Sequence, residues 1–230
     1  MPDTLPLYAD ALLLDMDGTL VDSGQSVVRC WNRLFAEYGV ERSFGHDLHG
    51  QPARTVLREV MPELDEDGRA AAARRIEQME IEDAASLEIL PGTERLLAEL
   101  DQAARTLGRP TWTIVTSCTD ALFAARWERS GLPTPPLLVT ADQVTHGKPD
   151  PEPYRLGAER LGVEAARALV VEDSVGGLQS GRAAGCGCLA LTTTTPAADL
   201  EPLSDAIATS LADLAIDVMD GALRISRRGA

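Results

Sequence analysis

The stretch LLLDMDGTLVDS, from Leu12 to Ser23, decides the fold. Its apolar start is too short for a helix and ends in two carboxylates, Asp15 and Asp17, followed by Gly18. An apolar run of this length before a glycine turn predicts a buried strand that opens into a tight loop. In open parallel sheets, ligands bind outside the carboxyl ends of the strands. The two acids are therefore candidates for a functional site.

Two carboxylates one residue apart at a strand end require a counter-charge. A divalent cation can supply it, and Mg²⁺ suits the position because it takes oxygen ligands from a few carboxylates together with substrate phosphate. Asp-x-Asp-Gly is also ordinary turn chemistry, since Asp and Gly both favour turns. The choice between a turn and a metal site depends on the rest of the chain.

Three later segments carry polar residues in a matching order: Thr116 in TWTIVTS, Lys148 in HGKPDPEPY, and Glu172-Asp173 in LVVEDSVGG. With the first stretch they resemble the motifs of the haloacid dehalogenase superfamily of phosphatases and phosphomutases. The resemblance covers nearly the full chain. From Trp112 to Leu191 it is greatest to the sugar- and polyol-phosphate phosphatases, although this chain has Cys118 where that group often has glycine.

Length and composition limit the possible functions. A chain of 230 residues with 44% hydrophobic residues can form one large domain or a core with an insertion. The formal net charge of −15 argues against nucleic acid or an anionic membrane as partner, whereas a small phosphate ester can still bind through a local metal and a lysine. Neither a membrane helix nor an export signal is visible, so we expect a cytoplasmic protein that is a monomer or weak homodimer.

The segment after Ser23 is predicted to be helical. Apolar residues recur there at spacings of three and four, at Val27, Val28, Trp31, Leu34, Phe35 and Tyr38, before Gly39 ends the pattern. A loop over 46–52 leads to a helix from Ala53, and the Ala/Arg/Glu-rich segment 65–86 indicates one or two more helices. Residues 24 to 88 are thus expected to form an all-helical block.

Chain length supports treating this block as an inserted domain. Asp15 and Thr116 are 101 residues apart, whereas one strand-helix-strand unit needs about 30. We predict a catalytic core from residues 1–22 and 91–230 and a helical cap from 23–90, whose two connections emerge beside the strand-end acids. Such a cap can act as a lid.

From Pro91 onward, strands and helices alternate. The pattern predicts helices over 93–107, 119–129, 153–161 and 175–184, and strands over 112–116, 137–140, 168–171, 188–191 and 206–209. Alternation of this kind predicts a Rossmann-like, doubly wound parallel sheet of the α/β class. Residues 216–226 are predicted to form a hairpin around Asp220-Gly221.

The resemblance implies a Mg²⁺-dependent phosphatase that hydrolyses a small sugar, polyol or glycolate-like phosphate. Asp15 would attack phosphorus and form an aspartyl-phosphate, and Asp17 would protonate the leaving alkoxide and later accept a proton from water. The metal would be held by the Asp15 carboxylate, the Asp17 backbone carbonyl and Asp173, with Glu172 as a ligand or a supporting group. A Glu172-Asp173 pair at a strand-to-helix turn can also serve as a helix cap.

The phosphoryl group would be bound by Thr116, Ser117 and Lys148 and by the backbone amides of Met16 and Asp17. In this arrangement Lys148 is a compact positive charge between Asp15 and the phosphate. A loop of the family cap lies over the site, which makes three further residues candidates for contact with the leaving group: His49, Gln51 and Arg54.

Three other functions remain to be compared with this one. A sugar phosphomutase of the β-phosphoglucomutase type would use the same core. A phospho-acceptor signalling domain also gathers strand-end acids around Mg²⁺, but the 70-residue insertion and the second acid, Asp17, disfavour it. Asp17 also disfavours a dehalogenase, because displacement of halide needs no acid to protonate an alcohol.

Overall fold

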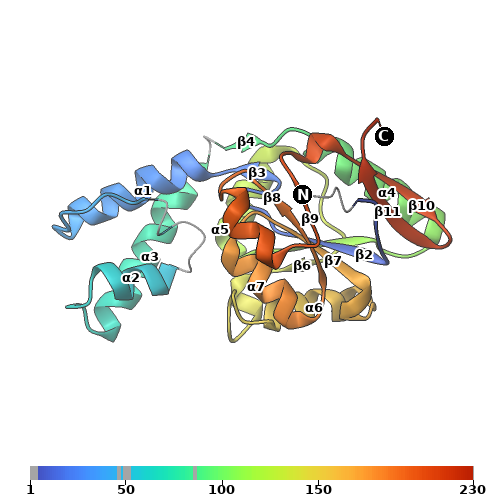
Figure 1. Cartoon of the computed structure of the whole chain (residues 1–230). Coiled ribbons are helices and arrows are strands. Elements are labelled where there is room, and N and C mark those ends of the chain that lie inside the picture. The colour runs from blue at the N-terminus through green and yellow to red at the C-terminus, as the bar shows by residue number, and fades with distance from the viewer. Residues whose placement is uncertain (1–4, 46–47, 49–52, 85–86, 230) are drawn as a thin grey trace.

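A parallel six-stranded sheet forms the centre of the computed structural model, which describes residues 5–45, 48, 53–84 and 87–229 (Figure 1). The strand order is β6-β5-β2-β7-β8-β9. The bounds are β2 Ala11–Leu14, β5 Trp112–Val115, β6 Leu138–Val139, β7 Ala168–Glu172, β8 Gly187–Leu191 and β9 Ala206–Ala208. Central β2 pairs Leu13 with both Thr113 of β5 and Val170 of β7. The predicted α/β fold is confirmed.

Helices cover both faces of this sheet, as the alternation predicts. On one face, α6 (Glu152–Leu161) and α7 (Val175–Ala184) pack against Leu13 and Val170. On the other, α4 (Thr93–Leu107) and α5 (Asp120–Ser130) share a hydrophobic cluster with Leu12 and Leu14. All four residues of β2 are buried, as expected for a strand covered on both faces.

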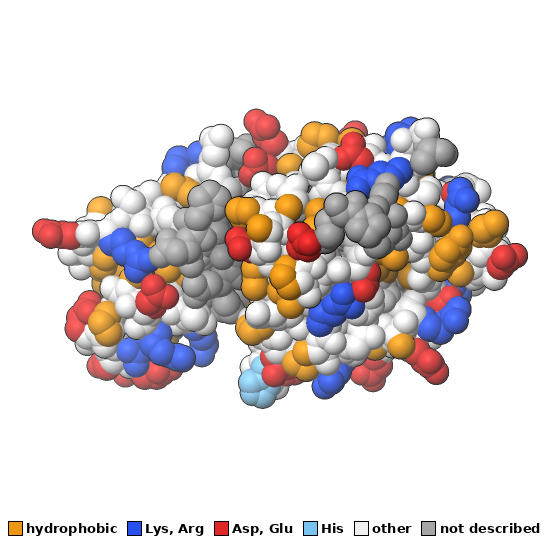
Figure 2. Space-filling model, in the orientation of Figure 1, with side chains coloured by type: hydrophobic (Ala, Val, Ile, Leu, Met, Phe, Trp, Pro, Cys, Tyr) orange, Lys and Arg blue, Asp and Glu red, His pale blue; other side chains and the backbone are white. Residues whose placement is uncertain are grey.

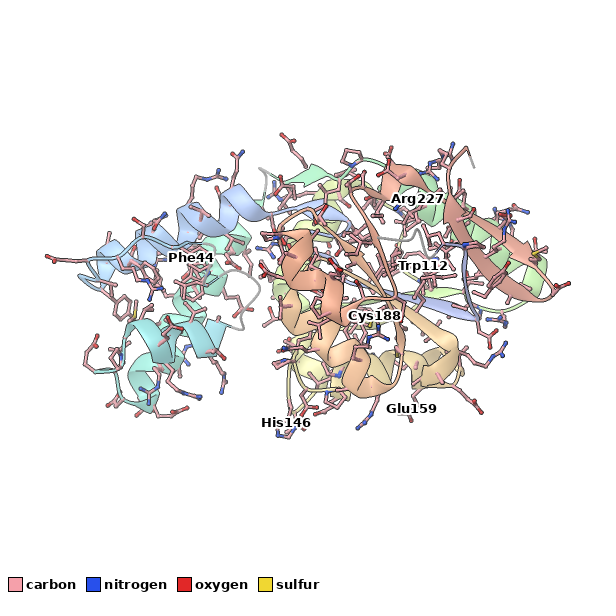
Figure 3. The ribbon with its side chains drawn as sticks, in the orientation of Figure 1. Phe44, Trp112, His146, Glu159, Cys188 and Arg227 are labelled. Atoms are coloured by element: carbon pink, nitrogen blue, oxygen red, sulfur yellow. The ribbon has the colours of Figure 1, made fainter. Side chains whose placement is uncertain are left out.

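Among the residues that the structure describes, three α-helices form the cap between β2 and β5: α1 (Gly24–Glu37), α2 (Ala53–Val60) and α3 (Glu66–Glu82). They enclose a hydrophobic cluster of their own, in which Trp31 stacks on Phe44 with ring centroids 5.3 Å apart. Figure 1 shows the cap projecting to one side of the sheet, and Figure 3 places Phe44 there, apart from Trp112 and Cys188 of the core. Segment 65–86, expected as one or two helices, contains the single long helix α3.

The connections between cap and core form a short ribbon that the sequence did not indicate. Strand β3 (Val21–Asp22) pairs antiparallel with β4 (Glu88–Ile89). Glu88, at the edge of the predicted helical block, is therefore a strand residue. Because the two connections are bonded to each other, the cap is attached to the core through one paired stalk.

A second, antiparallel sheet has the order β1-β11-β10, with bounds β1 Leu7–Ala9, β10 Leu214–Met219 and β11 Ala222–Arg227. The predicted hairpin is present, and its turn residues Asp220 and Gly221 have φ values of 51° and 80°, as a two-residue hairpin turn requires. Strand β10 packs on α4. Strand β1 was not predicted, because three residues are too few to show a periodic pattern.

The remaining elements are short. They are helix α8 (Ala197–Leu200) and the 3₁₀ turns Ala141–Gln143, Ala165–Arg167, Glu201–Leu203 and Leu211–Asp213. Within the described ranges, no helix combines the length and apolarity needed to cross a bilayer. On the face shown in Figure 2, acidic and basic side chains are interspersed, with no broad basic patch.

Candidate active site

The candidate site lies where the strand order reverses. From β2 the chain proceeds to β5 and β6 on one side, then returns to place β7 on the other side of β2. This switch point brings the carboxyl ends of β2, β5 and β7 together. Asp15 follows β2 and Thr116 follows β5, while Glu172 is the last residue of β7 and Asp173 follows it. The structure thus assembles residues that the sequence separates by more than 150 positions.

Lys148 joins this group from the loop between β6 and α6. Its Nζ donates to Asp15 Oδ1 at 2.6 Å and to Glu172 Oε1 at 2.7 Å. The lysine is buried, with 5% of its surface exposed. Although burial acts to lower the pKa of Lys148, the two carboxylates raise it above its ordinary value. The residue therefore stays cationic between two acids.

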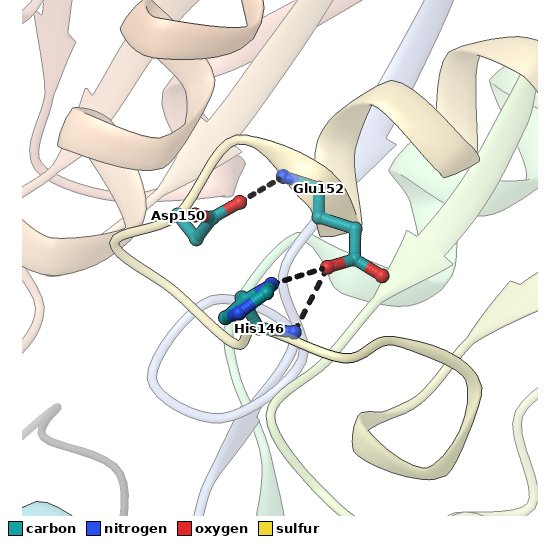
Figure 4. A group of neighbouring side chains, drawn as sticks. All are labelled: His146, Asp150 and Glu152. Atoms are coloured by element: carbon teal, nitrogen blue, oxygen red, sulfur yellow. Dashed lines mark hydrogen bonds and ion pairs between the residues drawn. The ribbon is translucent and has the colours of Figure 1, made fainter.

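The loop that carries Lys148 is held in shape by its own polar groups (Figure 4). The Glu152 carboxylate accepts hydrogen bonds from the backbone amides of Thr145 at 2.7 Å and His146 at 2.9 Å, and it lies 3.2 Å from His146 Nδ1. Asp150 Oδ1 accepts from the backbone amide of Glu152 at 2.9 Å. These contacts fix the turn on either side of Lys148.

Both carboxylate oxygens of Glu172 are occupied by hydrogen bonds. Oε1 accepts from Lys148 and, at 3.1 Å, from the Tyr154 hydroxyl. Oε2 accepts from the amides of Asp173 and Ser174 and from the Ser174 hydroxyl, each at 2.9 Å. Although burial acts to raise it, Lys148 and Ser174 hold the pKa of Glu172 below its usual value. Glu172 is an ionised partner that fixes Lys148.

Asp15, Glu172 and Asp173 form a buried acidic cluster with carboxylate oxygens within 4.8 Å of one another. Lys148 compensates only part of this charge. Burial, and then the charge of Glu172, raise the pKa of Asp173 to about 7, and burial raises the pKa of Asp15 well above its ordinary value. A buried oxygen cluster with excess negative charge is the donor set that a hard divalent cation prefers. The residues therefore fit the metal that the resemblance implies.

Gly18 allows the first loop to lie directly against Asp173. Its φ is +80°, and a Cβ at this position would lie 2.2 Å from Asp173 Oδ2. The same carboxylate accepts hydrogen bonds from Thr19 at 3.3 Å and from Thr194. Two loops therefore orient Asp173.

Asp17 is held from one side only. Its Oδ2 lies 2.9 Å from Arg126 Nη1 and accepts a hydrogen bond from the Cys118 thiol at 3.0 Å. Oδ1 is buried, and no described residue provides it with a hydrogen-bond partner. Burial, followed by the charge of Asp17, raises the pKa of Cys118, so it remains a thiol that can donate. Arg126 was not identified from the sequence, where it is one of two arginines in the helix predicted over 119–129.

The predicted phosphate-binding groups lie around this cluster. The buried Thr116 Oγ1 accepts from the Cys118 amide at 3.1 Å, which leaves its own hydrogen available for donation. The backbone amides of Met16 and Asp17 have no hydrogen-bond acceptor within the described ranges. Ser117 is exposed at the same strand end. These groups provide donors for an anion beside Asp15.

Three cap residues, His49, Gln51 and Arg54, were predicted to contact the leaving group. His49 and Gln51 lie outside the described residues. Arg54 is exposed on α2, and no hydrogen bond or ion pair among the described residues connects it with the strand-end group. A hollow of about 480 Å³ lies instead where α1 meets the core, lined by Asp22, Gly24, Gln25, Val28, Arg29, Thr193 and Thr194. Thr194 connects it to Asp173.

Comparison with known proteins agrees with this fold. The model of the haloacid dehalogenase-like hydrolase family matches residues 12–191. The chain therefore belongs to this family, and it is an enzyme of the hydrolase class. Hexitol phosphatase A of Escherichia coli is 40% identical over 78% of this chain and 81% of its own length.

Another relative is also named as a phosphatase. Validoxylamine A 7'-phosphate phosphatase of Streptomyces hygroscopicus is 31% identical over 84% of this chain and 89% of its own length. Among solved structures, a hydrolase from Pseudomonas syringae matches with a TM-score of 0.77 at 20% identity, covering 88% of this chain and 94% of that one. The structural likeness shows the shared fold.

Proposed function

We propose that this protein is a Mg²⁺-dependent phosphatase that hydrolyses a small sugar or polyol phosphate through an aspartyl-phosphate. The observation that carries this proposal is the buried Asp15 at the switch point, bonded to Lys148 and adjacent to Asp173. A carboxylate with a fixed cation beside it can act as a nucleophile toward a phosphate dianion, because the cation offsets their mutual repulsion. The phosphatase names of the relatives support the same reaction.

The first step forms a bond between an Asp15 oxygen and phosphorus and breaks the bond from phosphorus to the ester oxygen. The ester oxygen takes a proton from Asp17 as it leaves as an alcohol. Lys148, Thr116 and the amides of the first loop hold the phosphoryl oxygens. In the second step, water attacks phosphorus, Asp17 accepts its proton, and Asp15 is regenerated with release of inorganic phosphate.

The metal would be held by the Asp15 carboxylate, the backbone carbonyl of Asp17 and the Asp173 carboxylate. Mg²⁺ in that position supplies positive charge that neutralises phosphoryl oxygens. Glu172 is assigned a supporting role, because its two oxygens already accept five hydrogen bonds, among them that of Lys148.

The hollow between α1 and the core is the proposed site for the leaving group. Its lining combines the polar side chains of Asp22, Gln25 and Thr193 with the apolar Val28. Carboxylate, amide and hydroxyl groups can hydrogen-bond the hydroxyls of a sugar or polyol. This lining supports a hydroxyl-rich leaving group.

A phosphate-release screen tests the proposal. Purified protein with Mg²⁺ is incubated with hexitol 6-phosphates, 2-deoxyglucose 6-phosphate, fructose 1-phosphate, glycerol 1-phosphate and phosphoglycolate. We expect release of inorganic phosphate to be fastest for one of the sugar or polyol esters. Absence of release from every ester in the presence of Mg²⁺ would refute the proposed function.

The phosphomutase alternative is disfavoured by one residue. In mutases of the β-phosphoglucomutase type, a histidine on the first cap helix stands four residues before a tryptophan; counted back from Trp31, that position here is Val27. Valine can neither donate nor accept a proton, so water is expected to be the phosphoryl acceptor. With β-glucose 1-phosphate and a trace of the bisphosphate, glucose 6-phosphate formed much faster than free phosphate would favour the mutase instead.

A further inference from the structure

Arg126 is a buried cation that the reaction described above does not use. It lies on α5 with 3% of its surface exposed. Its Nη1 is 2.9 Å from Asp17 Oδ2 and 3.2 Å from Cys118 Sγ, and its Nη2 is 3.3 Å from Glu80 Oε2. Glu80 belongs to cap helix α3. A single core side chain therefore connects the proposed acid and base to the cap.

The contact with Arg126 makes the two carboxylate oxygens of Asp17 different from each other. Arg126 and Cys118 both bind Oδ2, whereas Oδ1 is buried and has no partner among the described residues. A carboxyl group that exchanges a proton with a substrate needs one oxygen for that exchange. Two donors on the other oxygen fix the rotation of the group and hence the position of the free oxygen.

The charges are compatible with this role. A lone guanidinium would favour the ionised form of a neighbouring carboxyl group, which would oppose its use as an acid. Arg126 is paired with Glu80, which is 9% exposed and whose pKa burial raises to about 7, so above that pH the two side chains together carry no net formal charge. The pair can therefore orient Asp17 through hydrogen bonds while adding little net charge beside it.

We propose that Arg126 is a positioning residue for Asp17, and that Glu80 of the cap holds Arg126 in place, so that docking of the cap sets the geometry of proton transfer to the leaving group. This inference rests on the proposed phosphatase function. It assigns to α3 a part in the chemistry that is separate from recognition of the substrate.

The test measures kcat/KM for substituted phenyl phosphates, whose shape varies little while the acidity of the phenol varies widely. This parameter covers the steps up to departure of the phenol, where Asp17 acts as the acid. Arg126→Met should lower it by about 100-fold for the least acidic phenol, the usual size of a general-acid contribution, and by far less for p-nitrophenyl phosphate. Arg126→Lys should restore part of the loss, because it keeps a donor and a charge.

A double-mutant cycle on phenyl phosphate separates positioning from a structural role. In an Asp17→Asn background, Arg126→Met should cause no further loss, because Arg126 acts through Asp17. A loss of the same size for every phenol, or full additivity with Asp17→Asn, would overturn the inference. Failure of the wild-type protein to hydrolyse any ester, by contrast, would refute the proposed function itself.

Two further variants keep the test decisive. Glu77, one turn before Glu80 on α3, accepts a hydrogen bond from Thr119 of the core, and no hydrogen bond or ion pair among the described residues connects it with Arg126 or Asp17. Glu77→Gln should therefore keep the wild-type dependence on phenol acidity. If Arg126→Met does not fold because Glu80 is left unpaired, the combined Arg126→Met and Glu80→Gln variant removes that buried charge and should show the same steepened dependence.

Discussion

Each charged residue of the site contacts a partner of opposite charge or hydrogen-bond donors, and all of them except the half-buried Asp17 are buried. Lys148 is bonded to Asp15 and Glu172, while Arg126 connects Asp17 with Glu80. In such networks, truncating one member leaves its partner as an uncompensated buried charge, which is strongly destabilising. Variants that keep the size and hydrogen-bonding ability of the side chain are therefore the informative ones.

Asp15→Asn is the direct test of the nucleophile. The change keeps the size of the side chain but removes the attacking charge, so kcat should fall by several orders of magnitude. The fold should survive, because the acidic cluster with Glu172 and Asp173 loses repulsion. Steady-state kinetics and thermal unfolding measure the two effects. More than a few per cent of wild-type activity would rule out Asp15 as nucleophile.

Gly18→Ala tests the approach of the first loop to Asp173. Gly39 is the matched control, since it also has positive φ but has open space where a Cβ would be. Both substitutions should lower the free energy of unfolding by about 1–2 kcal/mol for the left-handed backbone. Gly18→Ala alone should also abolish turnover, because its Cβ would displace the Asp173 carboxylate. Equal activity of the two variants would show that Asp173 tolerates the shift.

At the scale of elements, α3 of the cap contacts α5 of the core at two polar points. Glu77 accepts a hydrogen bond from Thr119 at the start of α5, and Glu80 pairs with Arg126 one to two turns further along. Burial, against the opposing charge of Arg126, raises the pKa of Glu80 to about 7. The contact between these helices should therefore respond to pH near neutrality.

The stability of the protein should show this response when compared with Glu80→Gln. Because the folded-state pKa of Glu80 is raised, the folded protein retains a proton that the unfolded chain loses near pH 4.5. Wild-type stability relative to Glu80→Gln should thus be highest below pH 4.5 and fall by on the order of 3 kcal/mol up to about pH 7. Urea unfolding of both proteins at several pH values measures the difference. A constant difference would mean that Glu80 has the same pKa in the folded and the unfolded protein.

The elements of the core could be predicted because their signals are local. The helix predicted over 93–107 has those bounds in the structure, and the strand run before Asp15 is buried as expected. Strand β1 and the ribbon of β3 with β4 were missed, because each strand has only two or three residues and pairs with a distant partner. Pairings of that kind leave no periodic pattern in the sequence.

Some residues of the candidate site could likewise be predicted from the sequence, and others could not. Asp15, Thr116 and Asp173 could be placed because each follows an apolar strand, and parallel strands bring their ends together. Arg126 could not, because its burial depends on the docking of α3, which no local pattern encodes. The same holds for the hollow beside α1, whose lining comes from two segments more than 160 residues apart.

At the scale of the whole molecule, cap and core have separate hydrophobic clusters, and the acidic cluster belongs to the core. A ligand that binds only the folded protein raises the midpoint of thermal unfolding. Mg²⁺ should therefore stabilise the protein, by about 2.7 kcal/mol at 100 times its dissociation constant. The Asp173→Asn variant should lose most of this effect.

Mg²⁺ and Ca²⁺ should have similar effects on the thermal stability of the protein but opposite effects on its turnover. Both ions should raise the unfolding midpoint, but turnover should require Mg²⁺, stop on chelation and be inhibited by Ca²⁺. The larger, more flexible coordination shell of Ca²⁺ would let Asp15 bind it through both oxygens and lose its attacking position. Phosphate release and thermal unfolding in parallel titrations provide the measurement. Full turnover after removal of all divalent ions would contradict the metal assignment.

The sheet formed by β1, β10 and β11 has a consequence for the order of events during synthesis. Strand β1 precedes every residue of the site, yet its partner β11 is made after all of them, since Ala9 pairs with Leu223. As the chain leaves the ribosome, β2, β5 and β7 can pair before β11 has been made. They then bring Asp15, Thr116 and Asp173 together while β1 has no strand to pair with. The antiparallel sheet can thus close only after the strands that carry the site have been synthesised. Its formation fixes the start of the chain, just before β2, after all residues of the catalytic centre have been synthesised.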